Sequence, residues 1–158
     1  MQRLVLPMLA LLVASCGPAQ DSEAWREAAF QRAMTAATRE ARAQLPYFWE
    51  HQAAPAETEF DFLLKVALTD ESGAEELVWV DQVTREGEAV TGQLASTPAS
   101  PGDLEKGDVV SFTDDMIADW AFFSGERLLG HYTTRVMLPR LPADQADAMR
   151  SMLGENPV

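Results

Sequence analysis

The sequence predicts an α+β domain in which an N-terminal helix packs on a meandering antiparallel sheet of five or six strands and a short C-terminal helix follows. Three observations lead to this prediction. Apolar residues recur at helical spacing before residue 46, and they alternate with polar residues from about residue 60. Turns rich in Gly, Ser and Pro then separate several short apolar segments. Helices and strands segregated along the chain in this way are typical of the α+β class.

The first 15 residues have the pattern of a removable secretion signal. Arg3 gives a short basic start, and residues 4–13 form an apolar segment interrupted only by Pro7. An apolar segment of about ten residues is too short to cross roughly 30 Å of hydrocarbon as a helix. Its length and the small residues that close it are those of a signal peptide. We therefore expect residues 1–15 to be removed.

The residues that close this segment, Val13-Ala14-Ser15-Cys16, resemble the lipobox of bacterial lipoproteins. That resemblance implies that Cys16 becomes the lipidated first residue of the mature chain, with residues 16–21 as a short linker. Gly17 follows the cysteine, so the aspartate that retains enteric lipoproteins in the inner membrane is absent. The resemblance thus implies an outer-membrane protein facing the periplasm. An ordinary signal peptide with a cysteine near its cleavage site is the alternative.

The composition limits the partners of the mature chain. The sequence has 25 acidic and 12 basic residues, a net charge of −13, and removal of Arg3 makes it one unit more negative. Such a surface repels phosphate backbones, which excludes nonspecific nucleic-acid binding. It also disfavours lying flat on anionic lipid, so we expect contact with the membrane only through lipid on Cys16. Because Cys16 is the only cysteine, the mature domain forms no internal disulfide.

The first element expected after the linker is a long helix. Ser22 can cap it, and we expect it to run to about Gln44, because Pro46 disfavours helix in the residue before it. One apolar stripe follows three- and four-residue spacings. Its members are Phe30, Ala33, Met34, Ala37, Ala41 and Leu45. We expect this narrow, alanine-rich stripe to pack on the sheet, and a loop to continue through Pro55.

Strands are expected wherever short apolar segments lie between turn residues. The expected strands are 60–68, 77–80, 89–95, 109–112, 116–123 and 127–138. The stretch from Thr113 to Asp119 could equally form one helical turn, since acidic residues suit a first turn. Pro142 then begins a short helix that Gly154 ends. Residues 22–158 are therefore expected to form a single domain.

Several segments, taken in order, resemble a known bacterial family. They are Ala41-Arg42-Ala43-Gln44-Leu45 with Phe48, Phe60 to Val66, Glu76 to Trp79, Gly92-Gln93-Leu94, Gly107-Asp108-Val109-Val110, Ile117-Ala118-Asp119-Trp120 and Gly130-His131-Tyr132-Thr133-Thr134-Arg135. Together they resemble the YegJ-like family, bacterial domain of unknown function number 2314, over residues 36–138. The family has no assigned activity, so the resemblance implies no mechanism. Many members are secreted or lipid-anchored, in agreement with the signal peptide.

The candidate site residues lie in the last two expected strands. A two-residue turn at Ser124-Gly125 or Gly125-Glu126 would place Asp119 and Tyr132 on one face, which is mostly apolar and expected to be core. Asp119 would then be a buried structural acid, or a functional one. The opposite face is the candidate binding surface. Its members are Trp120, His131, Thr133 and Arg135.

Two functional classes follow from these residues. The first is a non-catalytic envelope module that binds a protein, peptide or small ligand through its sheet. The second is an uncharacterised hydrolase with a site around Asp119 and His131. Ser111 could form a triad with these two residues, but no Gly-x-Ser-x-Gly motif surrounds it. We expect no metal or cofactor. Asp114, Asp115 and Asp119 lack further ligands at fixed spacing, and neither histidine has a His or Cys partner nearby in sequence.

Overall fold

The computed structural model describes residues 18–69, 73–99 and 104–157. The helices are α1 (Pro18–Ala43), α2 (Leu45–Ala53), α3 (Tyr132–Met137) and α4 (Ala143–Met152), with 3-10 turns η1 (Asp114–Met116) and η2 (Leu138–Arg140). The strands are β1 (Glu59–Thr69), β2 (Glu75–Glu86), β3 (Ala89–Leu94), β4 (Val109–Phe112), β5 (Ile117–Ser124) and β6 (Arg127–Gly130). The α+β class is confirmed.

The six strands form one antiparallel sheet in the order β4-β3-β2-β1-β5-β6. β1 to β4 follow one another as a meander, and the chain then returns through η1 to place β5 on the other side of β1. An isolated parallel β-bridge between Leu128 and Leu153 joins the C-terminal segment to β6. The sequence predicts a simple meander, and the strand order departs from it where the chain returns to place β5 beside β1.

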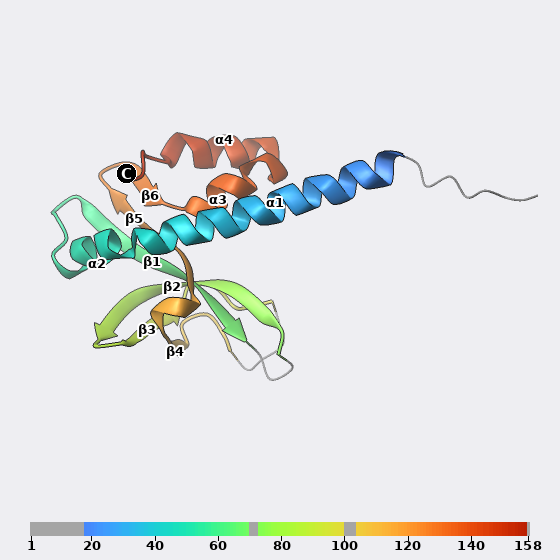
Figure 1. The fold of residues 1–158 in the computed structure, drawn as a ribbon. Coiled ribbons are helices and arrows are strands. Elements are labelled where there is room, and N and C mark those ends of the chain that lie inside the picture. Colours follow the sequence, from blue (N-terminus) through green and yellow to red (C-terminus); the bar gives the residue numbers. More distant parts are fainter. Residues whose placement is uncertain (1–17, 70–72, 100–103, 158) are drawn as a thin grey trace, which may run out of the picture.

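The core lies between the helices and one face of this sheet. Cross-strand pairing aligns Trp120, Leu64, Val80 and Leu94 in one buried row. The helical side chains packed into the same cluster are Ala37, Ala41, Leu45 and Phe48. Figure 1 shows α1 lying along the sheet, with its N-terminal half extending beyond it. The predicted packing of the alanine-rich helix on the sheet is therefore confirmed for the C-terminal half of α1.

The helical region differs from the prediction at both ends. α1 begins at Pro18, so residues 18–21, which the sequence assigns to a linker, are helical. The segment after Pro46, expected to be a loop, forms α2. Pro46 lies in the first turn of α2, where its missing N–H costs no helical hydrogen bond. Cys16 and the expected signal peptide lie outside the described residues. None of the helices that the structure describes between residues 18 and 157 is long and apolar enough to cross a membrane.

The last predicted strand is wrong beyond Gly130. Ser124 pairs with Arg127, so the chain turns at Gly125-Glu126, one of the two expected registers. β6 ends at Gly130, because Gly130 and His131 have φ values of 77° and 54° and turn the chain into α3. The sequence also left open whether the stretch from Thr113 to Asp119 forms a strand or one helical turn. A 3-10 turn occupies residues 114–116, and β5 follows it directly.

Candidate functional site

Asp119 is the most heavily hydrogen-bonded side chain among the predicted site residues, and it is fully buried. Its Oδ1 accepts from the backbone N–H groups of Trp120 at 2.9 Å and Tyr132 at 3.1 Å. Its Oδ2 accepts from the backbone N–H of Thr133 at 2.7 Å and from the Thr133 hydroxyl at 2.6 Å. Two of these donors belong to the first turn of α3, so the carboxylate fixes where α3 starts.

Lys65 lies beside this carboxylate on the neighbouring strand. Lys65 pairs with Asp119 on one side and with Trp79 on the other, which places the three side chains on one face of the sheet. The Lys65 ammonium donates to the Thr133 hydroxyl oxygen at 3.2 Å and lies 5.5 Å from the centre of the Trp79 ring. Burial lowers the pKa of Lys65, and the charge of Asp119 opposes that shift. Burial raises the pKa of Asp119 above its ordinary value, although its four hydrogen bonds act in the opposite direction and lower it.

His131 adjoins the same cluster. The ring lies 4.8 Å from that of Trp79, and Nδ1 is 2.8 Å from the Thr134 hydroxyl. Burial, together with the positive charges of Lys65 and Arg135, lowers the pKa of His131 to about 4. The imidazole is therefore neutral at pH 7.

Arg135 holds the C-terminal segment. Its guanidinium donates to the carbonyl oxygens of Gly130 at 3.1 Å and Gly154 at 2.7 Å, and to Asn156 Oδ1 at 3.0 Å. Asn156 Oδ1 also accepts from the backbone N–H of Gly130. Arg135 is thus engaged within the fold.

The predicted sidedness of these residues is wrong. Thr133, expected on the face of Trp120, bonds Asp119, while the ring of Tyr132, expected beside Asp119, lies 5.6 Å from that of Trp120. Trp120 is fully buried, and its indole N–H donates to the Ala41 carbonyl at 2.9 Å. The physical reason is the left-handed backbone of His131, which ends the strand and starts α3. Beyond it, side chains follow the helical period and no longer alternate between the two faces of a strand. The four residues of the candidate binding surface therefore form no common exposed face.

The geometry around Asp119 does not resemble a hydrolytic site. Asp119 and Thr133 are both 0% exposed, so a substrate does not reach the carboxylate. Ser111 lies on β4, and β3, β2 and β1 separate it from β5, about 19 Å at the usual strand spacing. Over residues 18–69, 73–99 and 104–157, no group of three or more His, Cys, Asp or Glu side chains is placed to hold a metal ion.

His51, which has no partner nearby in sequence, has one in the fold. Its Nδ1 lies 2.8 Å from Glu59 Oε1, and Glu59 Oε2 accepts from the backbone N–H of Ala56 at 3.0 Å. Burial alone would raise the pKa of Glu59, but these two hydrogen bonds outweigh it and lower the pKa. The pair ties the end of α2 to the start of β1.

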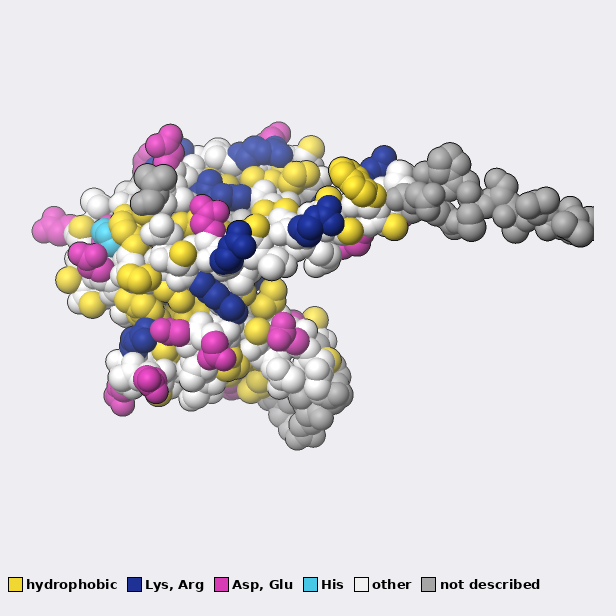
Figure 2. Space-filling view, viewed as in Figure 1, with side chains coloured by type: hydrophobic (Ala, Val, Ile, Leu, Met, Phe, Trp, Pro, Cys, Tyr) yellow, Lys and Arg dark blue, Asp and Glu magenta, His cyan; other side chains and the backbone are white. Residues whose placement is uncertain are grey.

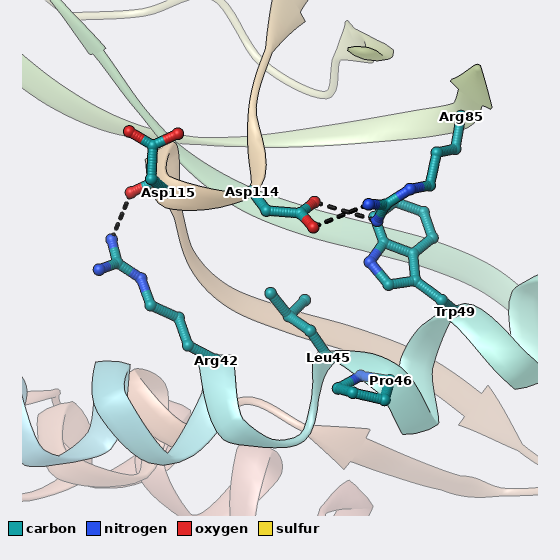
Figure 3. Close-up of a pocket in the computed structure, with 7 residues that line it drawn as sticks. All are labelled: Arg42, Leu45, Pro46, Trp49, Arg85, Asp114 and Asp115. Carbon is teal, nitrogen blue, oxygen red and sulfur yellow. Dashed lines mark hydrogen bonds and ion pairs between the residues drawn. The ribbon is translucent and has the colours of Figure 1, made fainter. Parts of the chain in front are cut away.

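An open groove under α2 is the more accessible candidate site (Figure 3). It has a volume of about 680 Å³. Leu45, Pro46 and Trp49 form its apolar side, and charged side chains line its other side. The charged lining residues are Arg42, Arg85, Asp114 and Asp115. We call these seven residues the Trp49 groove.

Hydrogen bonds fix the charged side of the Trp49 groove. Arg85 donates to both carboxylate oxygens of Asp114, at 3.1 and 2.9 Å, and its guanidinium lies 4.7 Å from the centre of the Trp49 ring. Arg42 donates to the carbonyl oxygens of Ile117 at 2.6 Å and Asp115 at 2.7 Å. The indole N–H of Trp49 is buried and finds no acceptor among the described residues.

Two further hollows continue the Trp49 groove. One, of about 600 Å³, shares Trp49 and Arg85 with it, and the other, of about 560 Å³, shares Arg42 and runs along α1. Sequence reasoning missed this groove because it assigned residues 46–55 to a loop. The helical spacing of Leu45, Phe48 and Trp49, with Pro46 at the start, could have predicted α2.

Comparison with known proteins identifies relatives without a described activity. The sequence model of a family described as "Uncharacterized protein conserved in bacteria (DUF2314)" matches residues 31–155. The "Uncharacterized protein YegJ" of Escherichia coli (strain K12) is 26% identical over 155 residues, which cover 97% of this chain and 99% of that protein. No solved structure matches the chain.

Proposed function

Because the chain belongs to DUF2314, a family of uncharacterized proteins conserved in bacteria, we propose its function from its own residues. The protein is an envelope lipoprotein, tethered to the outer membrane through lipid on Cys16 and facing the periplasm. Its folded domain is a non-catalytic module that binds an envelope protein or peptide.

The tether rests on the first residues of the chain. An apolar segment of signal-peptide length ends in Val13-Ala14-Ser15-Cys16, which has the lipobox pattern. One acyl chain gives only reversible membrane binding, whereas two or more give stable anchoring. Helix α1 begins at Pro18, so the folded domain starts almost directly after the lipidated residue.

The Trp49 groove is the single observation that carries the binding role. It combines an apolar side and an open mouth with charged side chains that hydrogen bonds hold in place. Pockets that recognise ligands are mostly apolar, with a few placed polar groups that set orientation. The groove therefore suits an apolar side chain of a partner, with polar groups of the partner beside its charged residues.

The hydrolase alternative has less support. A general acid or base has to come within hydrogen-bond reach of the reacting group. Asp119 is closed to solvent, and its two carboxylate oxygens already accept four hydrogen bonds from within the fold. His131 is 8% exposed, and the Thr134 hydroxyl lies at its Nδ1.

The groove is tested by partner capture with a matched pair of variants. Pro46 and Pro55 are both exposed, but only Pro46 lines the groove. Lipidated wild type, Pro46→Glu and Pro55→Glu are each used to capture proteins from solubilised envelope membranes. We expect wild type and Pro55→Glu to enrich the same partner, and Pro46→Glu to lose it at least tenfold, about 1.4 kcal/mol. Equal capture by Pro46→Glu would show that the groove is not the binding site.

The tether has its own test. Intact-mass analysis of the mature wild-type protein should show acyl chains on a chain that begins at Cys16, and Cys16→Ser should lack them. A mature wild-type chain without acyl groups would overturn the lipoprotein proposal.

A further inference from the structure

Charge is distributed unevenly around α1. Trp25, Arg32 and Arg39 are seven residues apart, and seven residues fall only about 20° short of two full helical turns. The three side chains therefore form one line along the helix, about 10 Å from one to the next. All three are exposed, Trp25 to 67%. Between them lie exposed small residues, Ala28, Ala36 and Ala43. We call these six residues the outer stripe of α1.

Two acidic residues of α1, Glu23 and Glu27, lie on the side of the helix away from the outer stripe. Glu27 accepts from Arg140 at 2.7 Å, so it faces the segment after α3. Glu40 lies about 60° around the helix from Trp25, on the edge of the stripe nearest α3. Burial, with a smaller effect of the Glu40 charge, raises the pKa of Tyr132 on α3 to about 12. Glu23 lies about 200° around the helix from Trp25. From Ser22 to Ala43, the outer stripe thus carries cations and an aromatic ring without a carboxylate.

The arginines of the outer stripe are not used by the fold. Neither Arg32 nor Arg39 makes a hydrogen bond or an ion pair with any residue that the structure describes. Figure 2 shows a line of Lys and Arg side chains following α1 across this face of the molecule. Their charge is therefore available to an anionic partner. The net charge of −13 predicts contact with the membrane only through lipid on Cys16, but headgroups beside α1 would meet this local positive charge first.

We propose that the outer stripe of α1 lies on the anionic headgroups of the membrane to which Cys16 is tethered. This inference rests on the lipid anchor of the proposed function. Because α1 begins two residues after Cys16, its first turns lie close to the membrane surface. Tryptophan prefers the membrane–water interface, and each arginine near an anionic surface is attracted to it. The alanines let the helix approach closely.

The proposed contact sets the height of the binding groove above the membrane. α1 has 26 residues and is about 39 Å long. A helix standing upright on its anchor would hold the Trp49 groove about that far from the lipid. With the outer stripe on the headgroups, the groove stays beside the membrane surface. The domain would then bind partners that lie at the membrane.

The contact is tested with the lipidated mature chain in vesicles of phosphatidylcholine with 30% phosphatidylglycerol, some lipids bearing a bromine quencher. We expect lipid quenching of tryptophan fluorescence that disappears in Trp25→Phe and weakens without phosphatidylglycerol. Arg32→Gln with Arg39→Gln should lower the ratio of docked to undocked protein about fivefold for each charge removed. Lys106→Gln with Arg150→Gln removes the same charge elsewhere on the exposed surface and should leave quenching unchanged.

Three results would overturn the contact. Absence of Trp25 quenching in protein that floats with the vesicles would leave the anchor intact and reject the docking of α1. An equal loss of lipid quenching in both double variants would show that docking depends on the total charge of the protein and not on the outer stripe. A dimer in vesicles that Trp25→Phe dissociates would assign the stripe to a second copy of the chain. Failure of the anchor itself is detected separately, as protein that neither carries acyl chains nor floats.

Discussion

The hydroxyl of Thr133 donates to Asp119 Oδ2 at 2.6 Å, and its oxygen accepts from the Lys65 ammonium at 3.2 Å. One threonine thus connects a buried acid on β5 with a half-buried base on β1. A charge inside a protein is costly unless it is hydrogen-bonded or paired. The connection therefore stabilises both charges at the point where α3 meets the sheet.

Asp119→Ala should destabilise the fold by about 3 kcal/mol, because it leaves several buried donors without their acceptor and Lys65 without its nearby opposite charge. Urea unfolding at pH 7 measures this change. Asp144→Ala, on the exposed first turn of α4, serves as the control and should change stability by no more than about 0.5 kcal/mol. Equal stability of the two variants would contradict a structural role for Asp119.

Thr133→Val should cost about 1–2 kcal/mol, because it keeps the shape of the side chain but removes the hydroxyl between Lys65 and Asp119. Thr133→Ser keeps the hydroxyl and should recover most of that loss. The comparison is again made by urea unfolding. If the serine variant were as unstable as the valine variant, the methyl packing of Thr133 and not its hydroxyl would be responsible.

The burial of Asp119 could be predicted from the sequence, but its partner could not. Asp119 lies two residues from Ile117 and from Ala121, and this apolar surrounding predicts a buried carboxylate, which the structure shows, although on the face of the sheet opposite Trp120. The turn at Gly125-Glu126 was also within reach, as Gly favours tight turns. Strand alternation then assigned Tyr132 to Asp119 instead of Thr133.

The error arises at Gly130 and His131, where two successive residues take left-handed conformations. Gly tolerates such a conformation and His adopts it only uncommonly, so the local sequence gives little warning of the turn. The tertiary contacts decide it, because the carboxylate of Asp119 bonds the N–H groups that start α3. The same limit hid the Trp49 groove, which joins α2 to η1 and β2, elements far apart in sequence.

Gly130→Ala should destabilise the protein by at least about 3 kcal/mol. A Cβ at this position would lie 2.1 Å from the carbonyl oxygen of Trp120, and the φ of 77° is unfavourable for alanine. Gly125→Ala is the matched control, since its φ is 62° but nothing lies within 4 Å of the added Cβ. We expect a loss of about 1 kcal/mol there. Similar losses at both positions, measured by thermal and urea unfolding, would contradict the close approach of Gly130 to β5.

Protonation of His131 should make the fold less stable in acid. Burial and the charges of Lys65 and Arg135 lower its folded pKa to about 4, from 6.5 in the unfolded chain. The unfolded state therefore binds a proton first, so the contribution is fully present above pH 6.5 and is lost as the pH falls to about 4. The difference in pKa corresponds to about 3 kcal/mol.

The contribution of His131 is isolated by comparing the pH dependence of wild type and His131→Asn. Asparagine tolerates the left-handed backbone at this position but does not titrate. His131→Asn also removes the contact of the imidazole with Trp79, which lowers the stability of the variant at every pH. The informative quantity is therefore how the difference in unfolding free energy between the two proteins changes with pH. Asp119 and Glu59 titrate in both proteins and cancel from that difference. We expect the stability advantage of wild type to shrink by about 3 kcal/mol between pH 7 and pH 4. A constant difference across that range would show that His131 keeps an ordinary pKa and is open to solvent.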